Sequence, residues 1–166
     1  RNQLSWQPFI CSSSSVLPEY KEYERGIACW LNATLGPLVK NYLLKLNTAI
    51  NPSPLSIMQS SGGTISAEKA ADRAVNLLLS GPAGGLAAAS YLARSLSIPG
   101  LMTFDMGGTS TDAALLDEGS IQLSNEGFIG PYPVGVPMVD MHTIGAGGGS
   151  IAYLDAGFLL HVGPQS

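Results

Sequence analysis

The apolar residues of this chain follow a helical period in its first hundred residues and a strand-like pattern after them. From about Glu19, apolar side chains recur every three or four positions, which predicts a long helix. The stripe consists of Ile27, Leu31, Leu35, Leu38, Tyr42 and Leu46. Gly36 and Pro37 interrupt it, so we expect either a kink or two helices end to end. Residues 1–18 show no helical period and are interpreted as an extended, strand-like lead-in.

The segment from 51 to 100 predicts one short strand and two further helices. NPSP at 51–54 should end the first helix, and LSIMQS at 55–60 is interpreted as a short buried strand. Ser66 can cap a short helix with Glu68 in its first turn, where the helix dipole favours a carboxylate. A longer helix is expected over LAAASYLARSL at 86–96, with Pro82 of the preceding SGPAGG (80–85) suited to a first helical turn. Its narrow apolar stripe consists of Leu86, Ala89, Leu92, Ala93 and Leu96.

From residue 101 the pattern is typical of strands and hairpins. LMTFDM at 101–106 is continuously apolar, as in a central strand. Residues 111–125 predict two strands joined at 117–119, and residues 151–162 predict a second hairpin. VPMVDMHTI at 136–144 reads as a further strand that leads into GAGGGS. We therefore predict an α/β fold with a mixed sheet, as a single domain over 1–166: mainly helical with one strand in 1–100, strands and hairpins in 101–166.

Composition excludes several classes of partner. The net charge is -4 and only eight residues are Lys or Arg, which argues against binding to nucleic acid or to an anionic membrane. The sequence shows neither a long apolar run nor a signal peptide, so we expect a cytoplasmic protein. Cys11 and Cys29 lack metal-site spacing and are interpreted as free or buried thiols. The chain starts at Arg1 and ends directly after an apolar run, which we interpret as a piece of a longer protein.

The stretch FDMGGTSTD at 104–112 is the first candidate site. Asp105 would end a buried strand, where a carboxylate needs a partner; hydrated Mg²⁺, held by one or two carboxylates, is a natural one. Gly107 and Gly108 lack Cβ atoms, so their amides can approach a phosphate closely. Further polar groups are offered by Thr109, Ser110, Thr111 and Asp112. The alternative is a simple hairpin turn in which both aspartates bond local amides.

Two further glycine-rich segments leave similar alternatives open. GAGGGS at 145–150 can admit a ligand or another backbone, or it can form a bulge or strand crossover. Asp140 and His142 would face the same side of the preceding strand, but two ligands are weak evidence for a metal site, and a hydrogen-bonded structural histidine is favoured. SGPAGG can supply amides to an anion, although ordinary helix-start chemistry also explains it.

No nucleophile and base pair is evident in the sequence. Neither cysteine has a nearby histidine, and the motifs GxSxG and GxxxxGK[ST] are absent. An α/β-hydrolase and a P-loop NTPase are therefore both disfavoured, and the catalytic residues stay unassigned.

The motif Asp-x-Gly-Gly-Thr-x-Thr-Asp, followed by a hairpin, resembles the second phosphate-binding motif of the actin, hexokinase and heat-shock-70 ATPase superfamily. More specifically, five segments in register resemble the hydantoinase A / 5-oxoprolinase family. They are LPEYKEYER (17–25), MQSSGGTISAEKAA (58–71), LLSGPAGG (78–85), TFDMGGTSTDAALLDEG (103–119) and VPMVDMHTIGAGGGSIAYLDAG (136–157).

This resemblance implies a ribonuclease-H-like (actin-like ATPase) lobe of an ATP-dependent cyclic-amide hydrolase. In such an enzyme ATP phosphorylates the carbonyl oxygen of the ring, and water then opens it; the protein mainly positions groups and neutralises charge. Carried over by motif, Asp105 holds Mg²⁺ through water, and ATP is bound by Asp105, Gly107, Gly108, Thr109, Thr111 and Asp112. The same carry-over makes Gly147, Gly148 and Gly149 nucleotide or interlobe contacts. The expected partners are a cyclic amide substrate and a hydantoinase B-type domain or subunit.

The chain also departs from the family pattern. The family's first phosphate motif, an N-terminal Asp-x-Gly-Gly-Thr, and the downstream region that contacts adenosine are both missing. We therefore expect the 166 residues alone to show little or no turnover. The alternative functions are the ATP-using subunit of an acetone-carboxylase-like enzyme and a non-catalytic ATPase switch of the actin or chaperone type.

Overall fold

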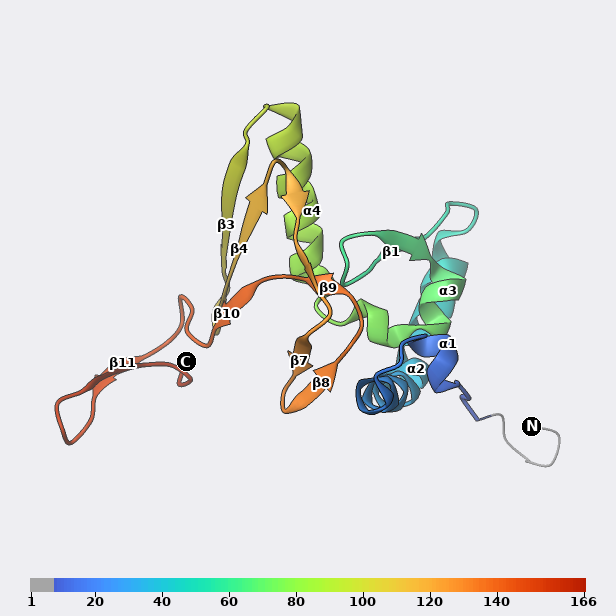
Figure 1. Cartoon of the computed structure of the whole chain (residues 1–166), viewed down its shortest axis with the longest axis horizontal. Helices are drawn as coiled ribbons and strands as arrows, with labels where there is room; N and C mark the ends of the chain where they lie inside the picture. The colour runs from blue at the N-terminus through green and yellow to red at the C-terminus, as the bar shows by residue number, and fades with distance from the viewer. Residues whose placement is uncertain (1–7) are drawn as a thin grey trace. The chain divides into compact units, whose positions relative to one another are not determined.

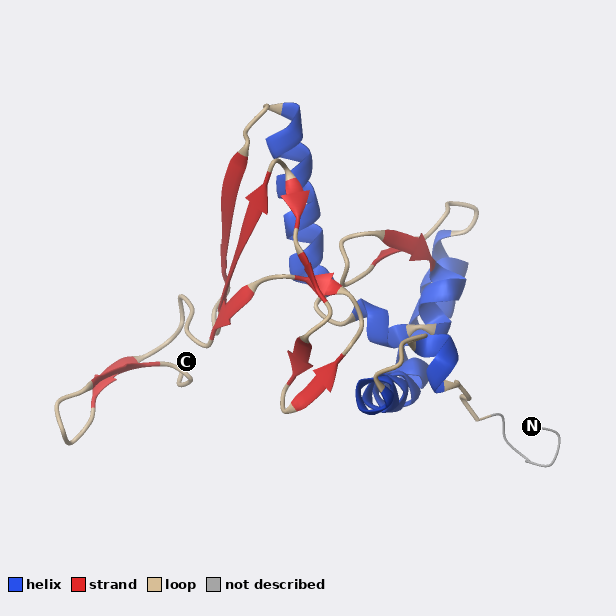
Figure 2. Ribbon diagram, viewed as in Figure 1, coloured by secondary structure: helices blue, strands red, loops and turns tan. Residues whose placement is uncertain are grey.

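The computed structural model describes residues 8–166 and divides into two compact units. Unit 1 extends to Gly84 and includes residues 123–139, whereas unit 2 consists of residues 85–122 and 140–166. Helices dominate the N-terminal part and strands the C-terminal part, which confirms the α/β class (Figures 1 and 2).

Unit 1 is built around one long helix. Its helical elements are α1 (Ser13–Val16), α2 (Glu22–Ile50), α3 (Ala67–Asp72) and η1 (Ala74–Leu77). Helix α2 runs unbroken for 29 residues with Pro37 inside it, so the expectation of two helices end to end is wrong. Contacts of α2 with α1, α3 and η1 offset the backbone hydrogen bond that proline cannot make. The helix ends at Ile50, as the NPSP sequence predicts.

Two expectations for unit 1 need correction at its N-terminal end and along α2. The lead-in contains helix α1 instead of being extended throughout, while residues 1–7 lie outside the described part. On α2, Leu38 and Tyr42 are 73% and 64% exposed, because the buried face is rotated away from the predicted stripe. The buried residues of α2 are Ala28, Leu31, Asn32, Gly36 and Leu43.

The single buried strand expected at 55–60 is one arm of a partly exposed hairpin. Strand β1 (Ser56–Met58) pairs antiparallel with β2 (Thr64–Ser66), and Gly62 has a φ of 81°, which the turn requires. Helix α3 begins directly after Ser66, as predicted, although the Ser66 side chain makes no capping hydrogen bond to the helix backbone.

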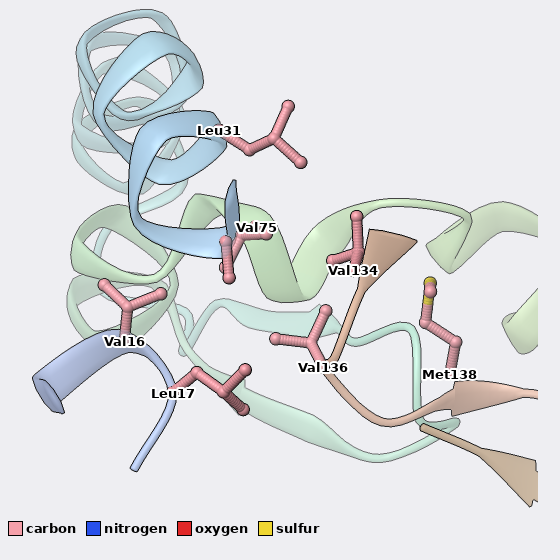
Figure 3. Packing of buried hydrophobic residues seen from close by; sticks show 8 residues of the cluster. Val16, Leu17, Leu31, Val75, Val134, Val136 and Met138 are labelled. Atoms are coloured by element: carbon pink, nitrogen blue, oxygen red, sulfur yellow. The ribbon is translucent and has the colours of Figure 1, made fainter. Parts of the chain in front are cut away.

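The core of unit 1 joins segments that are far apart in the sequence. Figure 3 shows Val16 and Leu17 from the lead-in facing Val75 of η1 and Val134 and Val136 of the C-terminal insertion. That insertion carries four short strands in antiparallel pairs, β6 (Leu123–Ser124) with β9 (Met138–Val139) and β7 (Gly127–Ile129) with β8 (Tyr132–Val134). The hydrophobic contacts therefore fix residues 134–138 against helical segments that lie far before them in the chain.

Unit 2 holds an antiparallel sheet and a separate hairpin. Its strands are β3 (Gly100–Met106), β4 (Thr111–Asp117), β5 (Ser120–Ile121), β10 (His142–Ile144), β11 (Ala152–Leu154) and β12 (Leu160–Val162). The sheet order is β10-β4-β3, with β5 also pairing with β4. The hairpins predicted at 111–125 and 151–162 are confirmed. Every strand pair in residues 8–166 is antiparallel, so this part of the chain does not form the expected mixed sheet.

Strand β3 lies at an edge of the described sheet, not at its centre. Its residues alternate in exposure, and Met102, Phe104 and Met106 are 61%, 63% and 54% exposed. The expected continuous burial is therefore wrong for this part of the chain, because only one face of the sheet is covered here.

Helix α4 (Ser80–Ser95) includes the SGPAGG sequence and has Pro82 in its first turn, as expected. The hydroxyl of Ser90 donates to the carbonyl of Gly119, in the β4–β5 turn, and so anchors the helix to the sheet. The buried face of α4 in unit 2 carries Leu86, Ser90 and Ala93. Leu92 and Leu96 of the predicted stripe are exposed, because the face of α4 that is actually buried runs through the small residues Ser90 and Ala93 instead.

The strand expected at 136–144 is divided between the two units. Its first part is β9 of unit 1 and its second part is β10 of unit 2, and Asp140 lies between them outside any strand. The prediction that Asp140 and His142 share one strand face is therefore wrong.

Candidate functional site

The turn between β3 and β4 forms the candidate site, and it lies wholly within unit 2. The amide of Gly107 donates to the carbonyl of Ser110 at 2.9 Å, which closes the turn. The strand register places Asp105 directly opposite Asp112. Directly paired residues of antiparallel strands project from the same face of the sheet, so the two carboxylates are neighbours.

Asp105 is exposed and Asp112 is half-buried. The expectation that Asp105 ends a buried strand is thus wrong, because β3 is an edge strand in the described chain. Its carboxylate is open to solvent and to a ligand. Two like charges placed opposite each other repel, and a cation between them relieves that repulsion.

Thr143 supports this pair from the neighbouring strand β10. It pairs with Asp112, and its Oγ1 donates to the Oδ1 of Asp112 at 2.6 Å. Sequence reasoning missed Thr143, which lies two residues before the glycine-rich segment. The sequence indicates only that Thr143 lies in a strand and faces the side opposite to His142 and Ile144. It does not indicate which strand pairs with β10.

The two glycine-rich segments interlock through their backbones. The amide of Gly148 donates to the carbonyl of Gly107 at 2.9 Å, and the amide of Gly149 donates to the carbonyl of Gly108 at 2.8 Å. The approach is so close that a Cβ atom added at Gly147 would lie 2.5 Å from the Gly107 oxygen. Only glycine fits at this position, so the second loop shapes the first.

Thr111 fastens the same junction at the start of β4. It is 2% exposed, and its Oγ1 donates to the carbonyl of Ala146 at 2.7 Å. Its hydroxyl is therefore used inside the protein. A direct role of Thr111 in the metal or phosphate shell stays a prediction.

The free amides of the site lie at the tip of the β3–β4 turn. The amide of Gly147 donates to the Oγ of Ser150 at 2.9 Å, so the amides of Gly147, Gly148 and Gly149 are all occupied. By contrast, the amides of Gly108 and Thr109 have no hydrogen-bond partner within residues 8–166. Successive unpaired amides in a turn are suited to an anion.

The structure thus brings every predicted site residue together in unit 2. These residues are Asp105, Gly107, Gly108, Thr109, Thr111, Asp112, Gly147, Gly148 and Gly149. Their ligand contacts stay predictions. The geometry adds that the two loops differ in their free groups: two amides of the first loop lack a partner, whereas the amides of residues 147–149 are all hydrogen-bonded.

The metal-binding capacity of the site rests on the two carboxylates alone. The described residues contain no cluster of three or more His, Cys, Asp and Glu that could hold a metal ion. Mg²⁺ does not need such a cluster, because it keeps several waters and takes one or two carboxylates together with phosphate oxygens. The neighbouring pair Asp105 and Asp112 fits that requirement.

Comparison with known proteins identifies the family of this chain. The family model described as hydantoinase/oxoprolinase matches residues 25–166. The chain belongs to the hydantoinase/oxoprolinase family. The family resemblance of the sequence is thereby confirmed.

Two curated relatives of this hydantoinase/oxoprolinase chain match over 95% of its length. Caprolactamase subunit alpha of Pseudomonas jessenii is 38% identical, and the match covers 23% of that protein. 5-Oxoprolinase of Saccharomyces cerevisiae is 35% identical, and the match covers 12% of it. The chain therefore spans less than a quarter of the length of these relatives.

Solved structures agree with this assignment. The crystal structure of the ATP-dependent caprolactamase from Pseudomonas jessenii has a TM-score of 0.82 at 38% identity, covering 94% of this chain and 23% of that one. The nucleotide-free structure of acetone carboxylase has a TM-score of 0.77 at 30% identity, covering 93% of this chain and 22% of that one.

The ribonuclease-H-like (actin-like) lobe and the single-domain description of 1–166 stay predictions. In residues 8–166, every helix falls short of the length or hydropathy of a transmembrane span.

Proposed function

We propose that this chain is part of an ATP-dependent cyclic-amide hydrolase and supplies one ATP-binding lobe. The observation that carries the proposal is the Asp105–Asp112 pair beside a turn with unpaired amides, in a chain of the hydantoinase/oxoprolinase family. Relatives named caprolactamase and 5-oxoprolinase support cyclic amides as the substrate class.

Each group in the turn has a defined task in this proposal. Asp105 would hold a hydrated Mg²⁺, and Asp112, oriented by Thr143, would support it as the second carboxylate. The amides of Gly108 and Thr109 bind phosphate oxygens. ATP supplies the phosphoryl group that activates the ring carbonyl oxygen, after which water opens the ring. The protein's contribution is positioning and charge neutralisation by backbone amides and metal, because this turn contains no Lys or Arg.

The partners in the proposal follow from the relatives. The caprolactamase match is an alpha subunit, and the acetone carboxylase match from Xanthobacter autotrophicus is a beta subunit. We propose that this chain acts with a second, hydantoinase B-type domain or subunit that handles the ring.

The decisive experiment titrates Mg-ATP into the full-length protein, as wild type and as Asp105→Ala. We expect the variant to bind Mg-ATP at least about tenfold more weakly, a loss of roughly 1.4 kcal/mol, and to lose ring-dependent ATP hydrolysis. Asp117→Ala, at the far end of β4, is the matched control and should bind as the wild type does. Unchanged binding and turnover in Asp105→Ala would remove the metal role assigned to this residue.

A second candidate is the ATP-using subunit of a carboxylase, which the similarity to acetone carboxylase favours. The two are separated by the co-substrate that stimulates ATP hydrolysis by the full-length protein. Stimulation by a cyclic amide indicates the hydrolase, and stimulation by a ketone with bicarbonate indicates the carboxylase. Hydrolysis that depends on neither, but on a protein client, would indicate the ATPase switch.

A further inference from the structure

The two cysteines of the chain lie side by side in unit 1, far along the chain from the nucleotide-binding turn. The Sγ atoms of Cys11 and Cys29 are 3.7 Å apart, and both side chains are half-buried. Each thiol also lies near the backbone carbonyl of the other residue, at 3.7 Å from Cys11 Sγ and 3.9 Å from Cys29 Sγ. Two thiols at this separation need only a small movement to form a bond.

The segment that carries Cys11 is held along α2 by a second contact. The ring of Phe9 packs against Gly36, where a side chain of any size would collide with it. Cys29 and Gly36 are seven residues apart, which is about two helical turns, so they lie on the same face of α2. Phe9 and Cys11 therefore hold the segment to one face of the helix at two points.

Access to this thiol pair comes through a pocket in unit 1. The pocket has a volume of about 320 Å³ and is lined by Phe9, Ile10, Cys11, Ser15, Val16, Asp72 and Arg73. It reaches Cys11 but not Cys29. Burial and the neighbouring Cys11 raise the pKa of the Cys29 thiol, which lowers the fraction of Cys29 present as the nucleophilic thiolate. A small molecule thus meets Cys11 first.

We propose that Cys11 and Cys29 form a reversible disulfide that clamps the N-terminal segment onto α2, with a low-molecular-weight disulfide as the oxidant. The Cys11 thiolate attacks one sulfur of the small disulfide, forms a mixed disulfide and releases one small thiolate. The Cys29 thiolate then attacks Sγ of Cys11 and releases the second. The two protein thiols lose two protons and two electrons, and the electrons reduce the small disulfide to two thiols.

The test incubates the full-length protein with oxidised glutathione, blocks free thiols and maps the peptides by mass spectrometry without reduction. We expect one cross-linked pair, Cys11 with Cys29, with a mass about 2 Da below that of the two thiol peptides. Cys29→Ser should stop at a glutathione adduct on Cys11, whereas Cys11→Ser should leave Cys29 unmodified.

The control moves the second thiol to another face of the same helix. In the double variant Cys29→Ser with Thr34→Cys, the new thiol lies on an exposed face of α2 and should not cross-link to Cys11. The proposal is overturned if wild-type protein yields no Cys11–Cys29 cross-link, or if the thiol introduced at position 34 cross-links as fast. Should a serine variant fail to fold, the wild-type peptide map still decides the question.

Discussion

A single buried asparagine fixes the helices of unit 1 to one another. Asn32 is fully buried on α2; its Nδ2 donates to the carbonyl of Asp72 at 3.0 Å, and its Oδ1 accepts from the amide of Val75 at 3.1 Å. One side chain thereby satisfies two backbone groups at the junction of α3 and η1. Buried polar groups are costly only when such partners are missing.

Replacement of Asn32 by Ala should therefore be costly. The change leaves the buried Val75 amide and the Asp72 carbonyl without these partners, and a buried unpaired group costs about 1–3 kcal/mol. We expect hydrogen exchange at the Val75 amide to accelerate at least about tenfold, because about 1.4 kcal/mol corresponds to a factor of ten. Asn41→Ala, on an exposed face of the same helix, is the control, and an equal acceleration there would contradict the assigned role.

Asp155 organises the tip of the β11–β12 hairpin. Its Oδ1 accepts from the amides of Gly157 and Leu159 at 2.8 and 3.0 Å, and its Oδ2 lies 2.8 Å from Nε2 of His161. The hydrogen bond with His161, followed by those from the two amides, lowers the pKa of Asp155 below its ordinary value of 3.8. All of these contacts favour the ionised carboxylate.

The sign of the resulting pH dependence follows from this lowered pKa. The stabilisation is fully present above the ordinary aspartate pKa and is lost as the pH falls through the lower folded value. We expect the amides of Gly157 and Leu159 to keep their protection from hydrogen exchange down to the ordinary aspartate pKa of 3.8 and to lose it below that pH. Asp155→Ala, which has no side-chain acceptor for the two amides, should show low protection at every pH, and a midpoint at or above the ordinary pKa in the wild type would refute the assignment.

At the scale of elements, the site depends on two loops that are distant in the sequence. Residues 107–110 close the β3–β4 turn, and residues 145–150 follow β10; the order β10-β4-β3 brings them together. The second loop uses its own amides to hold the carbonyls of the first. The exposed amides of the first loop thus have a fixed position before any ligand arrives, which reduces the entropy lost on binding.

A substitution at Gly147 tests this support directly. Gly147→Ala places a Cβ 2.5 Å from the Gly107 oxygen, so the two loops must separate. We expect Mg-ATP binding by the full-length protein to weaken by on the order of tenfold. Gly145→Ala is the matched control, since nothing lies within 4 Å of the position that its methyl group would take, and binding should be unchanged. Equal affinities of both variants and the wild type would show that the second loop does not shape the first.

At the scale of the whole molecule, the described chain corresponds to a minor part of its relatives. It matches 23% of the caprolactamase alpha subunit, and the N-terminal Asp-x-Gly-Gly-Thr motif expected from the family resemblance is not among its 166 residues. In the proposed function, the ATP site lies between two lobes and needs groups from both. The exposed apolar face of β3 also shows that the sheet of unit 2 is covered on one side only within residues 8–166.

We therefore expect the 166-residue chain on its own to show no ATP hydrolysis above background, with or without a cyclic amide. The full-length protein assayed under the same conditions is the positive control. Turnover by the isolated chain at the full-length rate would contradict the proposal that it supplies only one lobe.

Particular elements show how far sequence reasoning reaches. The end of α2, the short helix after Ser66 and two hairpins were predicted because prolines and turn glycines act locally, whereas α2 begins at Glu22 and not at the expected Glu19. The division of 136–144 between two units was not predicted, because a continuous apolar run does not say which strand each part pairs with. The rotation of the α2 face was missed for the same reason: burial of Gly36 and Asn32 depends on Phe9 and Val75, which are distant partners.

The sequence by itself determined the family and the chemical character of the candidate site. Two aspartates, adjacent glycines and hydroxyls within nine residues predict binding of a metal ion and a phosphate from the sequence alone. Only the tertiary structure decided that Asp105 faces Asp112, that Thr143 orients the latter, and that the amides of Gly148 and Gly149 are spent on holding the first loop. The reason is physical: the type of a residue sets which ligand it can bind, whereas strand register and loop contacts set which groups remain free to bind that ligand.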